Sequence, residues 1–326
     1  MTVLLAGHLC ADLTPALPGE PLVEPGRLAA VGPLQVTLGG SVANTGRVLG
    51  ALGIPIRAAA ATGDDSLGAL VRDLLTQEGF DTDGVQTMPG SGTSYSVVIQ
   101  PPGRDRTFWH HAGANDAFLP DEIDLDGIEL LHVGYPPLLA ALAADEGAAL
   151  RRLFARARAE GITTSLDLAV VDPESDAART DWSAFLAAVL PLTDLFTPSI
   201  DDLASALGGD SAPAERVDDA LALGAGAVVV TAGDRGLAFG AADPARMRSA
   251  GRVLAAVADS WSGVRLTAPT KPVDRIVSTN GAGDALTAGF IAGALAAIPP
   301  ADALDLAGRC AAAVVAGRPI PQPTRN

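Results

Sequence analysis

Residues 278–284 read Ser278, Thr279, Asn280, Gly281, Ala282, Gly283 and Asp284. An apolar stretch rich in Gly and Ala follows at once and has the character of a helix. Glycines at a helix start let backbone N–H groups surround an anion, and a carboxylate beside them can take a proton from a nucleophile. The stretch therefore predicts phosphoryl transfer, although an ordinary capped helix N-terminus is an equally good explanation when it is taken alone.

A second glycine-rich stretch lies near the N-terminus, after an apolar run at residues 34–38. It reads Gly39, Gly40, Ser41, Val42, Ala43, Asn44 and Thr45. The glycine pair leaves space for a ligand near the backbone, and Asn44 would offer a donor and an acceptor to a hydroxylated substrate. Taken alone, this stretch is better explained as a strand-to-helix turn with a capping asparagine.

Together the two stretches resemble the paired signatures of the ribokinase-like (PfkB) carbohydrate kinases. The resemblance runs from residue 3 to about residue 317. It implies an α/β fold in which a central, mostly parallel sheet is flanked by helices and carries a small β-sheet lid. We expect one ribokinase-like kinase domain at residues 1–318 and a flexible tail at residues 319–326.

Composition excludes several other classes of protein. A net charge of −16 disfavours nucleic acid as a partner, and 48% apolar residues indicate a compact globule. Lys271 is the only lysine and follows no glycine-rich loop, which excludes a P-loop and a protein-kinase site. No GxGxxG follows the first predicted strand, which argues against a dinucleotide-binding oxidoreductase.

The remaining composition predicts a cytoplasmic protein without a membrane partner. Cys10 and Cys310 are isolated, which fits a reducing compartment, and the N-terminus has no basic signal-peptide region. The longest weakly polar stretch, residues 285–298, is too short to span a bilayer.

Short apolar runs alternate with helical patterns along most of the chain, which predicts parallel strands with crossover helices. The expected strands are residues 3–6, 56–61, 130–133, 163–168, 195–197 and 227–231. Residues 146–160 have the apolar spacing of a helix that ends at Gly161. The segments at about 12–38 and 93–111 break this rhythm, and the resemblance assigns both to the lid.

The chemistry predicts a role for each residue of the late stretch. Asp284 is the expected general base, and the backbone of Gly281, Ala282, Gly283 and Asp284 is the expected anion hole. On the resemblance, Asp12 contacts sugar hydroxyls, the glycine pair and Asn44 complete that pocket, and Asn115 is a further substrate contact.

Nucleotide and metal contacts are assigned mainly on the resemblance. The family has Pro-Asn-x-x-Glu where this chain has Ser199 and Asp202, so Asp202 is the expected magnesium residue. The expected nucleotide contacts are Ser199, Thr231, Gly233, Gly236 and Asn280. Ser278 replaces an aspartate found in many relatives, which leaves open whether a monovalent cation is bound.

The sequence as a whole predicts an ATP-dependent carbohydrate kinase that phosphorylates a hydroxyl of a small sugar or sugar derivative, with Mg²⁺ on the phosphates. A nucleoside kinase on the same fold and a non-catalytic sugar or nucleotide sensor are the alternatives. In the resembling family the lid often mediates dimerisation, so a homodimer through the lid is also considered.

Overall fold

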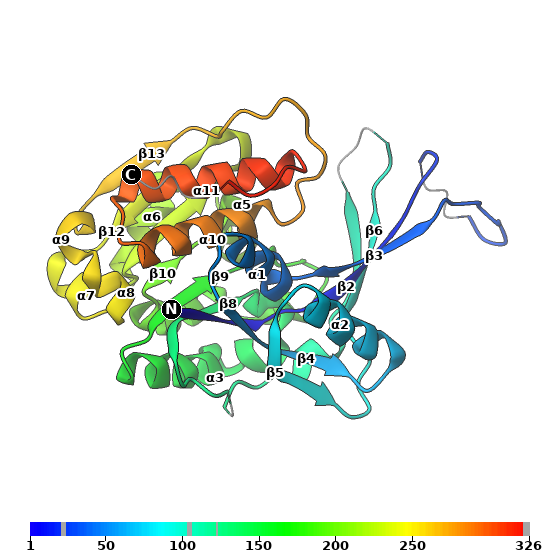
Figure 1. Ribbon diagram of the computed structural model, residues 1–326, viewed down its shortest axis with the longest axis horizontal. Helices are drawn as coiled ribbons and strands as arrows, with labels where there is room; N and C mark the ends of the chain where they lie inside the picture. The colour runs from blue at the N-terminus through cyan, green and yellow to red at the C-terminus, as the bar shows by residue number, and fades with distance from the viewer. Residues whose placement is uncertain (21–23, 103–105, 122, 322–326) are drawn as a thin grey trace.

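A nine-stranded sheet forms the centre of the protein, and a separate four-stranded sheet projects away from it (Figure 1). The computed structural model describes residues 1–20, 24–102, 106–121 and 123–321. The strand order of the large sheet is β13-β12-β11-β10-β9-β8-β1-β4-β5. Its strands are parallel except for β12, which is antiparallel to both of its neighbours.

The large sheet consists of β1 (Thr2–Gly7), β4 (Ile56–Gly63), β5 (Asp81–Met88), β8 (Ile128–Gly134), β9 (Thr163–Asp167), β10 (Leu195–Phe196), β11 (Ala227–Thr231), β12 (Leu237–Ala241) and β13 (Arg265–Ala268). The small sheet consists of β2 (Cys10–Pro15), β3 (Leu34–Gly39), β6 (Tyr95–Ile99) and β7 (Thr107–His111), in the order β3-β2-β6-β7.

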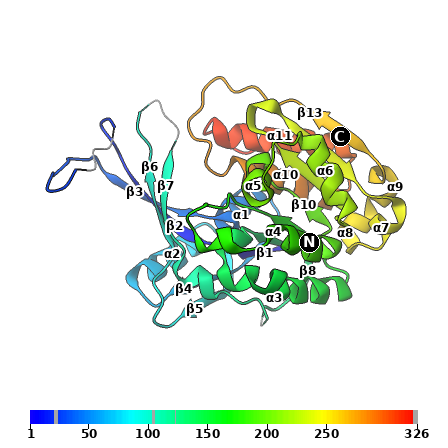
Figure 2. The same cartoon turned by 180° about the vertical axis from the view of Figure 1, so that it is seen from behind.

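Helices cover both faces of the large sheet, as the opposite views in Figure 1 and Figure 2 show. The helices of one face are α1 (Ser41–Ala51), α2 (Ser66–Gln77), α7 (Pro244–Arg248), α8 (Arg252–Ala256), α9 (Ala258–Trp261), α10 (Ala282–Leu295) and α11 (Pro300–Val315). Those of the other face are α3 (Ala140–Ala159), α4 (Trp182–Val189), α5 (Ile200–Leu207) and α6 (Pro213–Ala222). Short 3₁₀ turns include η1 (Gly113–Ala117) and η2 (Pro136–Leu138).

Burial on both faces explains why the strands are continuously apolar. Along β1, Val3 and Leu5 pack into the core under one helical layer, whereas Leu4 and Ala6 pack into the core under the other. Successive side chains of a strand point to opposite faces, so a strand covered on both sides needs apolar residues at every position.

Helix α10 is buried from Asp284 to Ala294 and lies against α1 and α11. Its many small residues make this close packing feasible. A Cβ atom at Gly289 would lie 2.7 Å from the Cα atom of Ala307 in α11. The first turn of α10 lies beside the first turn of α1, where Asn44 and Thr45 hydrogen-bond Asp284.

The predicted architecture is confirmed, including the small separate sheet that both unusual segments build. The six predicted strands are present with shifts of one or two residues at their ends. The helix predicted at 146–160 needs correction at its start, because Asp145, Glu146 and Gly147 have left-handed backbone angles that interrupt α3. Much of the segment at 12–38 is not strand, and most of the predicted tail, residues 322–326, lies outside the described residues.

Within the described ranges, none of the helices combines the length and the apolar character that crossing a membrane requires. The parallel strands bring their carboxyl ends to one edge of the large sheet, which is where α/β folds hold their ligands. The small sheet begins at this edge, because β2 follows β1 after only two residues.

Candidate active site

The first turn of α10 is shaped to receive an anion. Gly281 precedes the helix with a φ of 73°, a left-handed conformation that glycine adopts without strain. A Cβ atom at Gly283 would meet no atom within 4 Å, so the backbone there faces open space. Because the first N–H groups of a helix lack intrahelical partners and lie at its positive end, this turn suits a phosphoryl group.

The carboxylate of Asp284 is buried between this turn and α1. Asn44 Nδ2 donates to its Oδ2 atom at 3.0 Å, Tyr135 donates to the same oxygen at 2.8 Å, and Thr45 donates to Oδ1 at 3.3 Å. Burial raises the pKa of Asp284 to about 6, although these three hydrogen bonds oppose that rise. At neutral pH the group is thus mainly ionised and still a usable proton acceptor.

The glycine pair before α1 lies in close contact with the side chains of Asp12 and His8. A Cβ atom at Gly39 would lie 2.4 Å from Oδ1 of Asp12, and one at Gly40 would lie 2.6 Å from Nδ1 of His8. Gly40 also has a φ of 89°, so a larger residue would be strained there. The glycine pair therefore lets Asp12 and His8 approach the backbone closely, and its role toward a ligand stays a prediction.

Asp12 links the small sheet to the late glycine-rich stretch. Asn280 Nδ2 donates to its Oδ2 atom at 3.2 Å, and the Cys10 thiol contacts its Oδ1 atom at 3.5 Å. Burial raises the pKa of Asp12. Asn280 was expected to contact the nucleotide, but its side chain hydrogen-bonds Asp12, which was expected to contact the sugar.

Asn115 lies in η1, directly after the small sheet. It is fully buried, and its Nδ2 atom donates to the carbonyl oxygen of Leu9 at 3.0 Å. Its Oδ1 atom has no hydrogen-bond partner among the described residues. Asn115 therefore ties the end of β7 to the connection between β1 and β2.

Asp202 and Ser199 cap α5 reciprocally. The Ser199 hydroxyl accepts from the Asp202 backbone N–H at 3.0 Å, and Asp202 Oδ2 accepts from the Ser199 N–H at 2.8 Å. Asp167, at the end of β9, has a pKa well above its ordinary value because it is buried and lies near the charges of Asp202 and Asp284. Three carboxyl groups therefore lie close together at this edge of the sheet, where burial disfavours the charged form of each.

The expected nucleotide turn lies further along the same edge. Thr231 ends β11 and pairs in a bridge with Ser199, while Gly233 and Gly236 have φ values of 58° and 89°. Thr270 donates to the carbonyl oxygen of Gly233 at 2.5 Å. The turn is therefore joined to the segment that leads into the late glycine-rich stretch.

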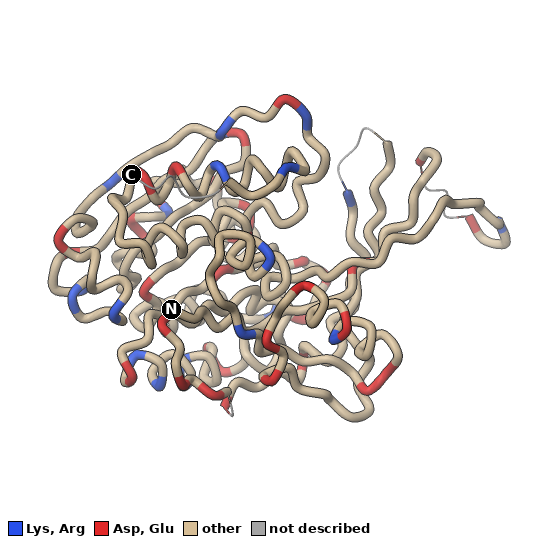
Figure 3. Tube along the Cα trace, in the orientation of Figure 1, with Lys and Arg blue, Asp and Glu red and all other residues tan. Residues whose placement is uncertain are grey.

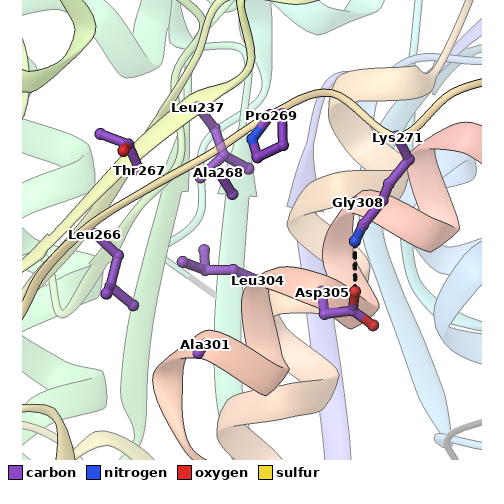
Figure 4. Close-up of a pocket in the computed structure, with 10 residues that line it drawn as sticks. All are labelled: Leu237, Leu266, Thr267, Ala268, Pro269, Lys271, Ala301, Leu304, Asp305 and Gly308. Atoms are coloured by element: carbon purple, nitrogen blue, oxygen red, sulfur yellow. Dashed lines mark hydrogen bonds and ion pairs between the residues drawn. The ribbon is translucent and has the colours of Figure 1, made fainter.

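A cavity of about 190 Å³ lies beside this turn (Figure 4). Its wall contains Leu237, Leu266, Thr267, Ala268, Pro269, Lys271, Ala301, Leu304, Asp305 and Gly308. Lys271 Nζ is 2.5 Å from Asp305 Oδ1 at the edge of the cavity, and Arg309 donates to the other oxygen of Asp305. Most of the residues that line the hollow are apolar, and Lys271 and Asp305 form one charged corner.

Sequence reasoning missed Tyr135, Thr45 and Asp167. Tyr135 directly follows β8 and Asp167 ends β9, so both lie at the carboxyl edge of the sheet. The signal that could have found them is the polar residue at the end of each predicted parallel strand.

Comparison with known proteins places this geometry in context. The structure matches a putative ribokinase II from E. coli in complex with ATP and Mg²⁺ at a TM-score of 0.72, with 22% identity over 99% of this chain and 96% of that one. The 2-dehydro-3-deoxygluconokinase of Thermoproteus tenax is 28% identical over 92% of this chain and 87% of its own length. The ATP-dependent ribose-1-phosphate kinase of Halopiger xanaduensis is 30% identical over 51% of this chain, and the match spans about half of that protein, 53%.

The fold is ribokinase-like. The candidate site described above lies at the carboxyl edge of its large sheet. The family model described as pfkB family carbohydrate kinase matches residues 2–318, which is nearly the whole chain. The chain therefore belongs to the pfkB family of carbohydrate kinases.

Replacing Asp284 with asparagine is expected to stabilise the folded protein at pH 8. The folded pKa of about 6 lies above the unfolded value of about 3.9, so this carboxyl contributes stability below pH 4 that is lost as the pH rises through 6. A difference of two pKa units corresponds to a change of about 3 kcal/mol in the free energy of unfolding. Asparagine can keep its oxygen toward Asn44 and Tyr135 while its amide donates to Thr45.

Urea unfolding of both proteins at pH 8 and pH 4.5 measures this effect. The advantage of Asp284→Asn should shrink at the lower pH, and every other titrating group is common to the two proteins. A wild-type protein that is the more stable of the two at pH 8 would contradict the burial cost assigned to Asp284.

Proposed function

We propose that the protein transfers the γ-phosphoryl group of ATP to a hydroxyl of a small sugar or sugar derivative. The observation that carries the proposal is the buried carboxylate of Asp284, held in the first turn of α10 and hydrogen-bonded by Asn44 from α1. It combines a proton acceptor and an anion-binding turn within one stretch of backbone. Family membership over residues 2–318 supports the same reaction class.

In the proposed reaction the acceptor hydroxyl oxygen attacks the γ-phosphorus. The bond between this phosphorus and the β–γ bridging oxygen breaks, and ADP leaves with that oxygen. Asp284 receives the hydroxyl proton, and the backbone N–H groups of Gly283 and Asp284 stabilise charge on the transferred group. Asp12 and Asn280 lie on the acceptor side and would orient its other hydroxyls.

The acidic edge of the sheet fits a role for Mg²⁺. Asp167 and Asp202 are buried near Asp284 and the pKa of each is raised, so a cation bound beside them would favour their ionised forms. Among residues that the structure describes, no three His, Cys, Asp or Glu side chains converge as ligands, so the nucleotide phosphates would have to complete the coordination. When bound, Mg²⁺ would neutralise phosphate charge, with Asp202 or Asp167 holding it through water.

Coupled ADP release is the direct test of the proposed function. Wild-type protein with ATP and Mg²⁺ is assayed against ribose, ribose 1-phosphate, fructose, 2-dehydro-3-deoxygluconate and inosine. We expect turnover with at least one sugar or sugar derivative. Turnover with inosine alone would establish the nucleoside kinase instead, and absence of turnover with an extended panel would favour a sensor.

Asp284→Asn should lower kcat by about 100- to 10,000-fold, the usual contribution of a general base. ATP binding, measured by calorimetry, should survive, because the backbone of the anion-binding turn is unchanged. Asp176→Asn, at an exposed aspartate outside the site, serves as the matched control. Full turnover in Asp284→Asn would remove Asp284 as the base.

The cavity of Figure 4 is the proposed seat of the adenine ring. Most residues of its wall are apolar, which suits a flat base, and the wall includes Leu237, which directly follows the turn at Gly233 and Gly236. Gly308 lies on α11 at the cavity wall, where a Cβ atom would approach the flexible Lys271 side chain at 3.2 Å.

Gly308→Phe should fill the cavity and raise the KM for ATP by about tenfold or more. The displaced adenine ring would lose about 1.4 kcal/mol or more of binding free energy from apolar contact. The KM for the acceptor should stay unchanged. Gly308→Ala adds one methyl group beside Lys271 and should behave like wild type. An unchanged KM for ATP in Gly308→Phe would place the base elsewhere.

We also propose that two copies of the chain pair through the small sheet. Leu28, Val31 and Leu34 are 96%, 55% and 58% exposed on the projecting arm. Strands β3 and β6 contain no charged residue, and Figure 3 shows few charged positions on this arm. Because each copy carries a net charge of −16, these two uncharged strands are where two copies would repel each other least.

Sedimentation equilibrium should give twice the chain mass of 32.8 kDa for the wild type. Leu34→Asp should give the monomer mass, because it places a charge in the proposed interface. Leu223→Asp, at an exposed leucine beyond α6, is the matched control and should remain dimeric. A wild-type mass of one chain would contradict the dimer.

A further inference from the structure

Tyr135 has an unusual backbone for its residue type. It follows Gly134 at the end of β8 with φ 68° and ψ 51°, a left-handed conformation that is rare outside glycine. Pro136 and Pro137 follow it in η2 and restrict the chain further. Strained residues of this kind gather at functional sites, where the surrounding structure holds them in place.

The conformation directs the Tyr135 hydroxyl onto the carboxylate of Asp284. The hydroxyl donates to Oδ2 at 2.8 Å, and Asn44 donates to the same oxygen at 3.0 Å. Among the residues that the structure describes, Oδ1 receives only the longer contact from Thr45, at 3.3 Å. Oδ2 is thus saturated with donors, which leaves Oδ1 as the oxygen with capacity for a further proton.

The Tyr135 hydroxyl stays protonated in this setting. Burial, followed by the charges of Asp284, Asp167 and Asp202, holds the pKa of Tyr135 well above its ordinary value. A group that keeps its proton is a permanent donor, and its hydrogen bond lowers the pKa of Asp284.

The Tyr135 ring also lies next to His8, and His8 in turn contacts His110 in the small sheet. The ring centroids of His8 and Tyr135 are 5.7 Å apart, and His8 Nε2 lies 3.3 Å from Nε2 of His110 in β7. Ser96 in β6 contacts the other ring nitrogen of His110 at 3.0 Å. Burial lowers the pKa of both histidines, which suits a contact in which one neutral ring donates and the other accepts.

We propose that Tyr135 is a positioning residue that saturates Oδ2 of Asp284 and so selects Oδ1 as the proton acceptor. The His8–His110 contact makes the position of the Tyr135 hydroxyl depend on the small sheet covering the site. The proposal rests on the proposed phosphoryl transfer. It adds that the position of β7 affects Asp284 through the side chains of His110, His8 and Tyr135, each of which contacts the next.

Tyr135→Phe removes the hydroxyl and keeps the ring. We expect kcat to fall by about tenfold, the usual effect of losing a hydrogen bond to a charged group, with an unchanged KM for ATP. The acidic limb of the kcat profile should move up by about one pH unit, because a donor that lowers the pKa of Asp284 is lost. Tyr95→Phe, at the other tyrosine of the chain, is the matched control. An unmoved profile would overturn the proposal.

A second measurement separates this inference from the proposed function. The carboxyl ¹³C resonance of Asp284, assigned by its loss in Asp284→Asn, is followed against pH. It should titrate at higher pH in Tyr135→Phe than in the wild type even if no acceptor is turned over. A resonance that titrates identically in the two proteins would refute the role of Tyr135, whereas a shifted titration without turnover would refute only the proposed reaction.

His110→Phe tests the link to the small sheet. It should shift the Asp284 titration in the same direction as Tyr135→Phe, by a smaller amount, because His8 loses its hydrogen-bond partner and no longer holds the Tyr135 ring in a fixed position. His111→Phe is the matched control, since successive residues of a strand point to opposite faces. Wild-type titration in His110→Phe would refute the coupling to the small sheet.

Discussion

The structure depends on burying one carboxylate at the meeting point of two helices. Burial disfavours the charged form of Asp284, and donors from Asn44, Thr45 and Tyr135 only partly offset that cost. The donors come from α1 and from the end of β8, so the large sheet and two helices must all be in place before the carboxylate is stabilised. The site is thus built from residues about 240 positions apart in the chain.

Glycines make this meeting point geometrically feasible. Gly39 and Gly40 let Asp12 and His8 lie against the start of α1, and Gly281 turns the chain into α10. These side chains also connect to the small sheet, because Asp12 lies in β2 and His8 contacts His110 in β7. The small sheet is thereby joined to the proposed base rather than simply lying over it.

Local patterns predicted the parallel strands and their crossover helices, and the family resemblance predicted the small separate sheet. Buried parallel strands require continuous apolar runs, and the two glycine-rich stretches mark turns that few other residues allow. Tyr135 and Asp167 were not predicted because their roles depend on strand order, which places the ends of β8 and β9 beside α10. The close approach of Asp12 and His8 to Gly39 and Gly40 could not be predicted for a similar reason, since these side chains come from β2 and from the connection between β1 and β2.

The most direct test is a crystal structure of the protein grown with ADP, Mg²⁺ and aluminium fluoride. The fluoride group mimics the phosphoryl group in transfer. We predict that it lies within hydrogen-bond distance of the backbone nitrogens of Gly283 and Asp284, with Oδ1 of Asp284 facing the position of the incoming hydroxyl. A fluoride group bound away from the first turn of α10 would contradict the assignment of this turn and its carboxylate to phosphoryl transfer.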